Sequence, residues 1–152
     1  MSGCCLTKGI DNLTFLVVDD DAFMRQLLSK VLWSFGAGDV LTAESGEEGL
    51  RILHACHIDL IVCDVVMGGI SGLKFVKLVR DMHVIDGSGR HLTPIVMLTA
   101  HADEQVVTAA MRLGANGCLV KPLSVGHLAK MISRLCGVTA PAVPAGAQRR
   151  AG

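Results

Sequence analysis

The chain has 152 residues, enough for one compact domain, and 51% of them are hydrophobic, which argues against a disordered chain. Its apolar runs fall far short of a bilayer span, so we expect no membrane insertion. Fourteen basic and fourteen acidic residues cancel, which leaves no excess positive charge for direct binding of nucleic acid.

From Thr14 onward, short aliphatic runs alternate with longer amphipathic runs. The short runs lack the alternation of polar and apolar residues that marks a half-exposed sheet, and this is typical of buried parallel strands. We predict five strands, at Phe15–Val18, Asp39–Thr42, Leu60–Cys63, Ile95–Thr99 and Gly117–Val120.

The longer runs have apolar residues at helical spacing, on one face only. Ser45 followed by Glu48 is typical of a capping box, Gly114 of a helix C-cap and Ser124 of an N-cap. We predict five helices, at Ala22–Phe35, Gly46–Cys56, Leu73–Met82, Asp103–Leu113 and Ser124–Leu135.

This alternation predicts an α/β fold: a doubly wound (βα)5 domain with an all-parallel open sheet and helices on both faces. A flavodoxin-like strand order, 2-1-3-4-5, would make the first and third strands neighbours. We expect the domain to cover residues 12–136, with a flexible N-terminus at 1–11 and a flexible tail rich in Ala, Pro and Gly at 137–152. A mobile loop is expected at residues 83–93.

Six cysteines occur without any Cys-x-x-Cys spacing, and three of them lie inside apolar runs. We interpret them as buried free thiols, including Cys56 at the end of the second helix. The first residues lack the basic start and apolar core of a secretion signal. A cytoplasmic location is therefore expected.

Polar residues follow four of the five predicted strands, at the edge where open α/β sheets bind ligands. Asp19, Asp20 and Asp21 follow the first strand and Asp64 the third. The fourth ends at Thr99, and Lys121 follows the fifth. An acidic run after a strand is often only a solvated turn or an N-cap, but polar residues at four strand ends on one edge indicate a common site.

If Asp19, Asp20 and Asp64 share one small volume, their charges repel unless a cation lies between them. Hard oxygen ligands favour Mg²⁺, with Mn²⁺ as a second candidate. Lys121 supplies a positive charge for a phosphoryl oxygen and Thr99 a hydroxyl donor. Together these groups indicate phosphoryl transfer to an aspartate.

Five separated motifs resemble receiver domains of response regulators in two-component signalling, especially the single-domain chemotaxis type. They are Phe15-Leu-Val-Val-Asp-Asp20, Leu60-Ile-Val-Cys-Asp64, Gly72-Leu73, Met97-Leu-Thr-Ala100, and Gly114-Ala-Asn-Gly117 with Lys121-Pro122. They occur in the family's order, and the resemblance covers residues 12–136.

The resemblance implies that Asp64 accepts a phosphoryl group from a histidine kinase or phosphotransfer protein, and that Asp19, Asp20 and the backbone carbonyl of Val66 hold Mg²⁺. It implies a cis bond before Pro122. It also implies that the domain is a switch, not an enzyme on other substrates, and catalyses only its own phosphorylation and dephosphorylation. A downstream protein would bind the face formed by the fourth helix, fifth strand and fifth helix.

The chain departs from the family at three places. Cys118 stands where many members have a switch aromatic, so aromatic gating cannot operate in that form. Met67-Gly68-Gly69 replaces the usual Met-Pro pair, which predicts a looser loop. Val66 and His101 would flank an attacking water, and we hypothesise that apolar Val66 slows hydrolysis of the phosphoryl group.

Two alternatives stay open on the sequence alone. One is a pseudo-receiver that is never phosphorylated and only binds partners. The other is a haloacid-dehalogenase-type phosphatase with Asp19 as nucleophile; it would need an acidic pair after a later strand, where only Asp103 and Glu104 are present. For a receiver, the output partner could be a flagellar switch, a phosphorelay histidine protein, or a kinase that uses the domain as a phosphate sink.

Overall fold

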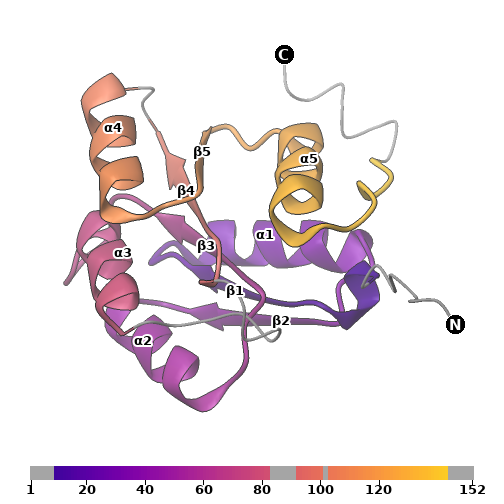
Figure 1. The fold of residues 1–152 in the computed structure, drawn as a ribbon, viewed down its shortest axis with the longest axis horizontal. Helices are drawn as coiled ribbons and strands as arrows, with labels where there is room; N and C mark the ends of the chain where they lie inside the picture. The colour runs from indigo at the N-terminus through magenta and orange to yellow at the C-terminus, as the bar shows by residue number, and fades with distance from the viewer. Residues whose placement is uncertain (1–8, 83–91, 101–102, 144–152) are drawn as a thin grey trace, which may run out of the picture.

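The computed structural model describes residues 9–82, 92–100 and 103–143. A five-stranded sheet forms its centre, with helices packed on both faces (Figure 1). The strands are β1 (Thr14–Val18), β2 (Asp39–Ala43), β3 (Leu60–Asp64), β4 (Ile95–Thr99) and β5 (Gly117–Val120). The helices are η1 (Ile10–Asn12), α1 (Ala22–Ser34), α2 (Gly46–Ala55), α3 (Gly72–Asp81), α4 (Glu104–Leu113) and α5 (Val125–Cys136).

All strand pairs are parallel, and their order is β2-β1-β3-β4-β5. The predicted doubly wound, flavodoxin-like fold is therefore confirmed. β1 and β3 are neighbours, with Val18 paired in register with Cys63. The residues that follow these two strands consequently meet at one edge of the sheet.

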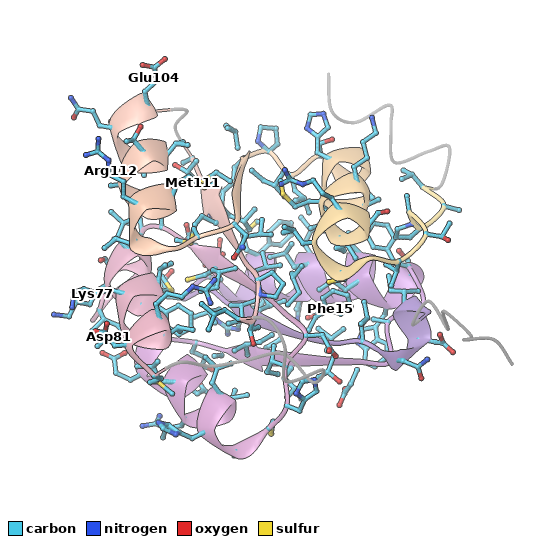
Figure 2. The ribbon with its side chains drawn as sticks, in the orientation of Figure 1. Phe15, Lys77, Asp81, Glu104, Met111 and Arg112 are labelled. Atoms are coloured by element: carbon cyan, nitrogen blue, oxygen red, sulfur yellow. The ribbon has the colours of Figure 1, made fainter. Side chains whose placement is uncertain are left out.

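The core consists of two layers, one on each face of the sheet. Phe15, fully buried in β1 (Figure 2), packs with leucines of α1 and α5, whereas its neighbour Leu16 packs with residues of α2, α3 and α4. All residues of β3 and β4 are buried. Burial on both faces explains why these strands have no polar alternation in the sequence.

Each of the five long helices begins with a side-chain cap, since the first backbone N–H groups of a helix have no partner within it. The capping oxygens belong to Asp21, Ser45, Ser71, Asp103 and Ser124. Asp21 is thus an N-cap, the common role of an acid after a strand, whereas Asp19 and Asp20 are not. Gly114 ends α4 in the left-handed conformation, as predicted.

Two expectations about burial need correction. Cys56 is exposed, because α2 already ends at Ala55 and Cys56 continues in extended conformation. Cys118 and Cys136 are only half-buried, so Cys63 is the fully buried thiol among the described cysteines.

The predicted domain limits remain a prediction, although described residues beyond both of them touch the core. Ile10 and Val143 pack against the layer of α1 and α5, and Val138 is buried there. The predicted loop at 83–93 lies outside the described residues except for Leu92 and Thr93, and so do residues 1–8 and 144–152. None of the helices in the described part of the chain has the length and apolar character of a membrane span.

Candidate functional site

Asp19 follows β1 directly and is held rigidly. Its N–H donates to the carbonyl of Ala43 at 3.1 Å, which extends the pairing of β1 with β2 by one residue. Its carboxylate oxygen Oδ1 accepts from the N–H of Asp21 at 2.9 Å, and the side chain is fully buried. The neighbouring Asp20 is exposed.

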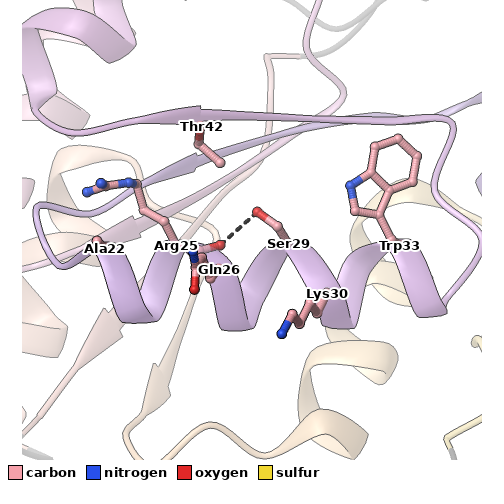
Figure 3. Close-up of a pocket in the computed structure, with 7 residues that line it drawn as sticks. All are labelled: Ala22, Arg25, Gln26, Ser29, Lys30, Trp33 and Thr42. Carbon is pink, nitrogen blue, oxygen red and sulfur yellow. Dashed lines mark hydrogen bonds between the residues drawn. The ribbon is translucent and has the colours of Figure 1, made fainter.

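Arg25 of α1 supports Asp19 from outside the sheet. Its Nη1 donates to the carbonyl oxygen of Asp19 at 2.8 Å, and its Nη2 lies 3.7 Å from Oε1 of Glu44. Figure 3 shows Arg25 along a groove of about 440 Å³ that is lined by α1 and by Thr42 of β2, where Ser29 Oγ donates to the Arg25 carbonyl. Only 16% of the Arg25 side chain is exposed.

Asp64 is the last residue of β3 and is buried beside Asp19. Asp19, Asp20 and Asp64 each offer a carboxylate oxygen, and these oxygens lie within 4.8 Å of one another. The three acids predicted from the strand ends are therefore together in space, as the parallel pairing of β1 and β3 requires.

Lys121 approaches the acids from the end of β5. Its Nζ lies 3.2 Å from Oδ2 of Asp64 and 3.9 Å from Oδ2 of Asp19. The backbone N–H of Lys121 donates to the carbonyl of Thr99 at 2.8 Å, and the bond from Lys121 to Pro122 is cis. β4 lies between β3 and β5, so the long lysine side chain reaches across one strand.

Thr99 is the last residue of β4 and is buried. It comes one residue after Leu98, the register partner of Asp64, so it reaches the same edge of the sheet. His101, expected to flank the site, lies outside the described residues.

The site is short of positive charge. The pKa of Asp19 is raised from 3.8 to about 6, chiefly by burial and also by the charge of Asp64, while the Asp21 N–H and Lys121 act in the opposite direction. Asp19 Oδ2 is buried without a hydrogen-bond partner among the described residues. An unpartnered buried carboxylate oxygen is costly, and a hard divalent cation beside it would remove that cost. The donor set therefore fits Mg²⁺.

The loop from β3 to α3 carries contacts that the sequence did not reveal. Val66 exposes 76% of its residue surface, while its N–H donates to Asp64 Oδ1 at 3.3 Å. Gly68 N–H donates to Asp20 Oδ2 at 3.1 Å, and Ile70 N–H donates to Glu47 Oε1 at 3.4 Å. Acidic side chains from two other segments thus hold the glycine-containing loop.

The phosphatase alternative required an acidic pair for chemistry after the fourth strand. There Asp103 accepts from the N–H of Gln105 at 2.8 Å as the N-cap of α4, and Glu104 is the first residue of that exposed helical turn. Both acids serve the start of a helix and do not join the group of Asp19, Asp20 and Asp64.

A family model described as "Response regulator receiver domain" matches residues 15–133. The chain is 31% identical over 123 residues to the chemotaxis protein CheY of Pseudomonas aeruginosa, covering 81% of this chain and 95% of that protein. It is 32% identical over 123 residues to the transcriptional regulatory protein YvrH of Bacillus subtilis, covering 81% of this chain and 48% of that protein. The chain therefore spans about half the length of YvrH.

A structure of the chemotaxis protein CheY4 of Vibrio cholerae superposes on this fold with a TM-score of 0.72. It is 35% identical, and the match covers 81% of this chain and 98% of that one. Sequence and structure thus lead to the same family of proteins.

Proposed function

Because the chain belongs to the family of response regulator receiver domains, we propose that it is a phosphorylation-activated signalling switch whose phosphoacceptor is Asp64. The observation that carries this proposal is the position of the Asp64 carboxylate, 3.2 Å from Lys121 Nζ and beside an acid whose Oδ2 has no hydrogen-bond partner among the described residues. The donor would be a histidine kinase or a histidine phosphotransfer protein.

Asp19, Asp20, Asp64 and the backbone carbonyl of Val66 would hold Mg²⁺, or Mn²⁺ in its place. A bound divalent cation neutralises charge on the phosphoryl oxygens during transfer. Asp19 would contribute its buried Oδ2, and the exposed Asp20 lies at the open side of the site. Burial and repulsion by Asp64 make the ionised form of Asp19 unfavourable, and a bound cation would stabilise that form.

The chain's own residues would act on the phosphoryl group in three ways. A carboxylate oxygen of Asp64 forms the new bond to phosphorus as the bond from phosphorus to the donor nitrogen breaks. Lys121 exchanges its ion pair with Asp64 for one with a phosphoryl oxygen, and the Thr99 hydroxyl donates a hydrogen bond to another phosphoryl oxygen. Water later attacks phosphorus, the bond from phosphorus to the Asp64 oxygen breaks, and inorganic phosphate leaves with the carboxylate restored. The domain would catalyse only these two reactions, its own phosphorylation and dephosphorylation.

The face formed by α4, β5 and α5 is the proposed output surface. α5 contains no acidic residue, and His127, Lys130 and Arg134 are exposed on it. They line a groove of about 320 Å³ together with Cys118, Leu119 and Met131. On α4, Met111 is also exposed (Figure 2). This mixture of cationic and apolar groups supports an acidic partner segment with at least one apolar side chain.

Cys118 gives this surface its particular character. Burial raises the pKa of the Cys118 thiol, so the side chain stays a small neutral group next to the groove. An aromatic residue would be larger than this thiol. We propose that the partner supplies the large side chain here, in contrast to relatives that carry their own aromatic switch at this position.

The free thiols of Cys63, Cys118 and Cys136 support a reducing compartment, and we propose that the protein acts in the cytoplasm. The partner at the output surface would be a flagellar switch, a phosphorelay histidine protein, or a kinase that discards phosphate onto this domain.

Intact mass spectrometry tests the proposal on wild type and Asp64→Ala after incubation with acetyl phosphate, in Mg²⁺ and in EDTA. We expect a gain of about 80 Da in wild type, dependent on Mg²⁺ and absent in Asp64→Ala. No gain in wild type, even with phosphoramidate, would favour the pseudo-receiver. A gain that survives in Asp64→Ala would place the nucleophile elsewhere.

A further inference from the structure

The segment from Val66 to Ile70 has to present one carbonyl oxygen at a fixed place, although its sequence gives it little stiffness. It contains Gly68 and Gly69, and Gly69 has φ +76°. Glycine loses more conformational freedom on ordering than any other residue. Contacts from outside the segment must therefore hold it in position.

Glu47, in the first turn of α2, makes such contacts. Its Oε1 accepts from the N–H of Ile70 at 3.4 Å. The same carboxylate lies against Gly69, where an added Cβ would be 3.0 Å from Oε1 and 3.3 Å from Oε2. The preceding Gly46 packs so tightly on Ile70 that a Cβ there would lie 2.5 Å from the Ile70 side chain. The start of α2 thus fixes one end of the segment.

The other end is held from within the acidic site. Asp20 Oδ2 accepts from Gly68 N–H at 3.1 Å, and Asp64 Oδ1 from Val66 N–H at 3.3 Å. Both carboxylates are among the proposed metal ligands, so a cation would compete for their oxygens. Glu47 is different, because it holds the segment without belonging to the group of Asp19, Asp20 and Asp64.

We propose that Glu47 is a positioning residue for the metal site: it orders Gly69 and Ile70 so that the Val66 carbonyl is in place before the cation binds. The inference rests on the proposed function, which assigns that carbonyl to the metal. Residues behind the ligands change metal affinity by about 10- to 100-fold in well-studied sites. The Ile70 hydrogen bond is long, so the effect here should be near the lower end.

Calorimetric titration of the full chain with Mg²⁺ tests the proposal on Glu47→Ala and Glu47→Gln. Glu47→Ala should bind Mg²⁺ about tenfold more weakly. Glu47→Gln keeps an oxygen that can accept from Ile70, so it should stay within about threefold of wild type, the scale of losing one exposed charge. A loss as large in Glu47→Gln as in Glu47→Ala would overturn the proposal, because charge alone would then explain the effect.

Glu48→Ala is the matched control. This variant removes the same charge from the same helical turn. The Glu48 side chain, however, accepts from Glu44 N–H through Oε2, and among the described hydrogen bonds none joins Glu48 to the segment from Val66 to Ile70. Its Mg²⁺ affinity should also stay within about threefold of wild type. A tenfold loss in this variant would overturn the specific role of Glu47.

Hydrogen exchange on the metal-free chain separates this inference from the proposed function. Glu47→Ala should speed amide exchange in residues 66–71 and leave residues 49–55 of α2 unchanged, while Glu47→Gln should match wild type. Unchanged exchange at 66–71 in Glu47→Ala would overturn the positioning role. A wild type that binds no Mg²⁺ would contradict the proposed metal site, even where the exchange result supports the contact of Glu47 with the loop.

Discussion

Asp19 is the residue on which the electrostatics of the site depend. Its side chain is fully buried, one of its oxygens has no hydrogen-bond partner among the described residues, and burial raises its pKa to about 6. The protein keeps this acid where ionisation is unfavourable in the absence of a cation. A residue that served only stability would be better replaced by an apolar or amide side chain of similar size.

The raised pKa of Asp19 predicts a pH dependence of stability. The pKa of Asp19 in the folded state lies above the ordinary 3.8, so folding favours the protonated acid. The contribution of Asp19 to the free energy of unfolding is therefore fully present below pH 3.8 and is lost as the pH rises through about 6. In metal-free protein, the unfolding free energy of wild type minus that of Asp19→Asn should fall by roughly 1 to 3 kcal/mol between about pH 4 and about pH 7.

Urea unfolding in EDTA measures this difference, and Asp19→Asn is a suitable reference because its side-chain oxygen can still accept from Asp21 N–H. Saturating Mg²⁺ should raise the stability of wild type more than that of Asp19→Asn, since the cation binds the charged form. A difference between the two proteins that does not change with pH would contradict the assigned environment of Asp19.

At the scale of elements, Arg80 joins α3 to the start of β4 and the turn before β5. Its Nε donates to the Gly114 carbonyl at 3.0 Å, its Nη1 to the Thr93 carbonyl at 2.8 Å and its Nη2 to Asn116 Oδ1 at 2.8 Å. The same Asn116 oxygen accepts from Ile95 N–H at 2.9 Å. Burial lowers the pKa of the Arg80 guanidinium, so this contact carries a desolvation cost offset by the hydrogen bonds it makes.

Replacing Arg80 with Met should lower the unfolding free energy by about 2 to 4 kcal/mol, because three acceptors lose a charged donor. Lys77→Met is the control on the same helix: Lys77 forms an exposed pair with Asp81 at 3.2 Å (Figure 2), and its loss should change stability by less than about 1 kcal/mol. Urea unfolding of both variants measures these losses, and an equal loss of unfolding free energy in the two variants would contradict the structural role of Arg80.

The sequence predicted the elements well where the signal is local. The five strands and the helices α1 to α5 lie within one residue of their predicted ends, because β-branched runs and caps such as Ser45 and Gly114 depend on neighbours in the chain. The short helix η1 was not predicted. Arg80 and Glu47 were missed because their partners are brought close only by the tertiary fold. Helical spacing gave Cys56 an inward position, but it could not show that the helix ends one residue earlier.

The site itself was more predictable than these contacts. In a parallel sheet the residues after adjacent strands converge, so Asp19, Asp20, Asp64 and Lys121 could be grouped once the strand order was assumed. The sequence pattern could not show how the acids are hydrogen-bonded. It did not reveal that Asp19 Oδ2 has no hydrogen-bond partner among the described residues, or that Asp20 accepts from Gly68 N–H. These details depend on side-chain conformation at the site.

At the scale of the whole molecule, β5 connects the acidic site with the proposed output surface. Lys121, which contacts Asp64, directly follows β5. The strand residues before it are Val120, which is 45% exposed, and then Leu119 and Cys118, which both line the cationic groove. A change in the partner of Lys121 would therefore reach the output surface over three residues. Although the chain has no net charge, this surface is locally basic, which favours an acidic partner.

Hydrogen exchange of phosphorylated and unphosphorylated protein tests this account most directly, with the intact mass recorded on the same samples. In wild type with Mg²⁺ and acetyl phosphate, we predict phosphorylation together with altered exchange in residues 117–136 of β5 and α5. In Asp64→Ala, neither the mass nor the exchange should change. A phosphorylated wild type whose exchange is unaltered beyond the acidic site, or an equal change in Asp64→Ala, would contradict a switch driven by Asp64.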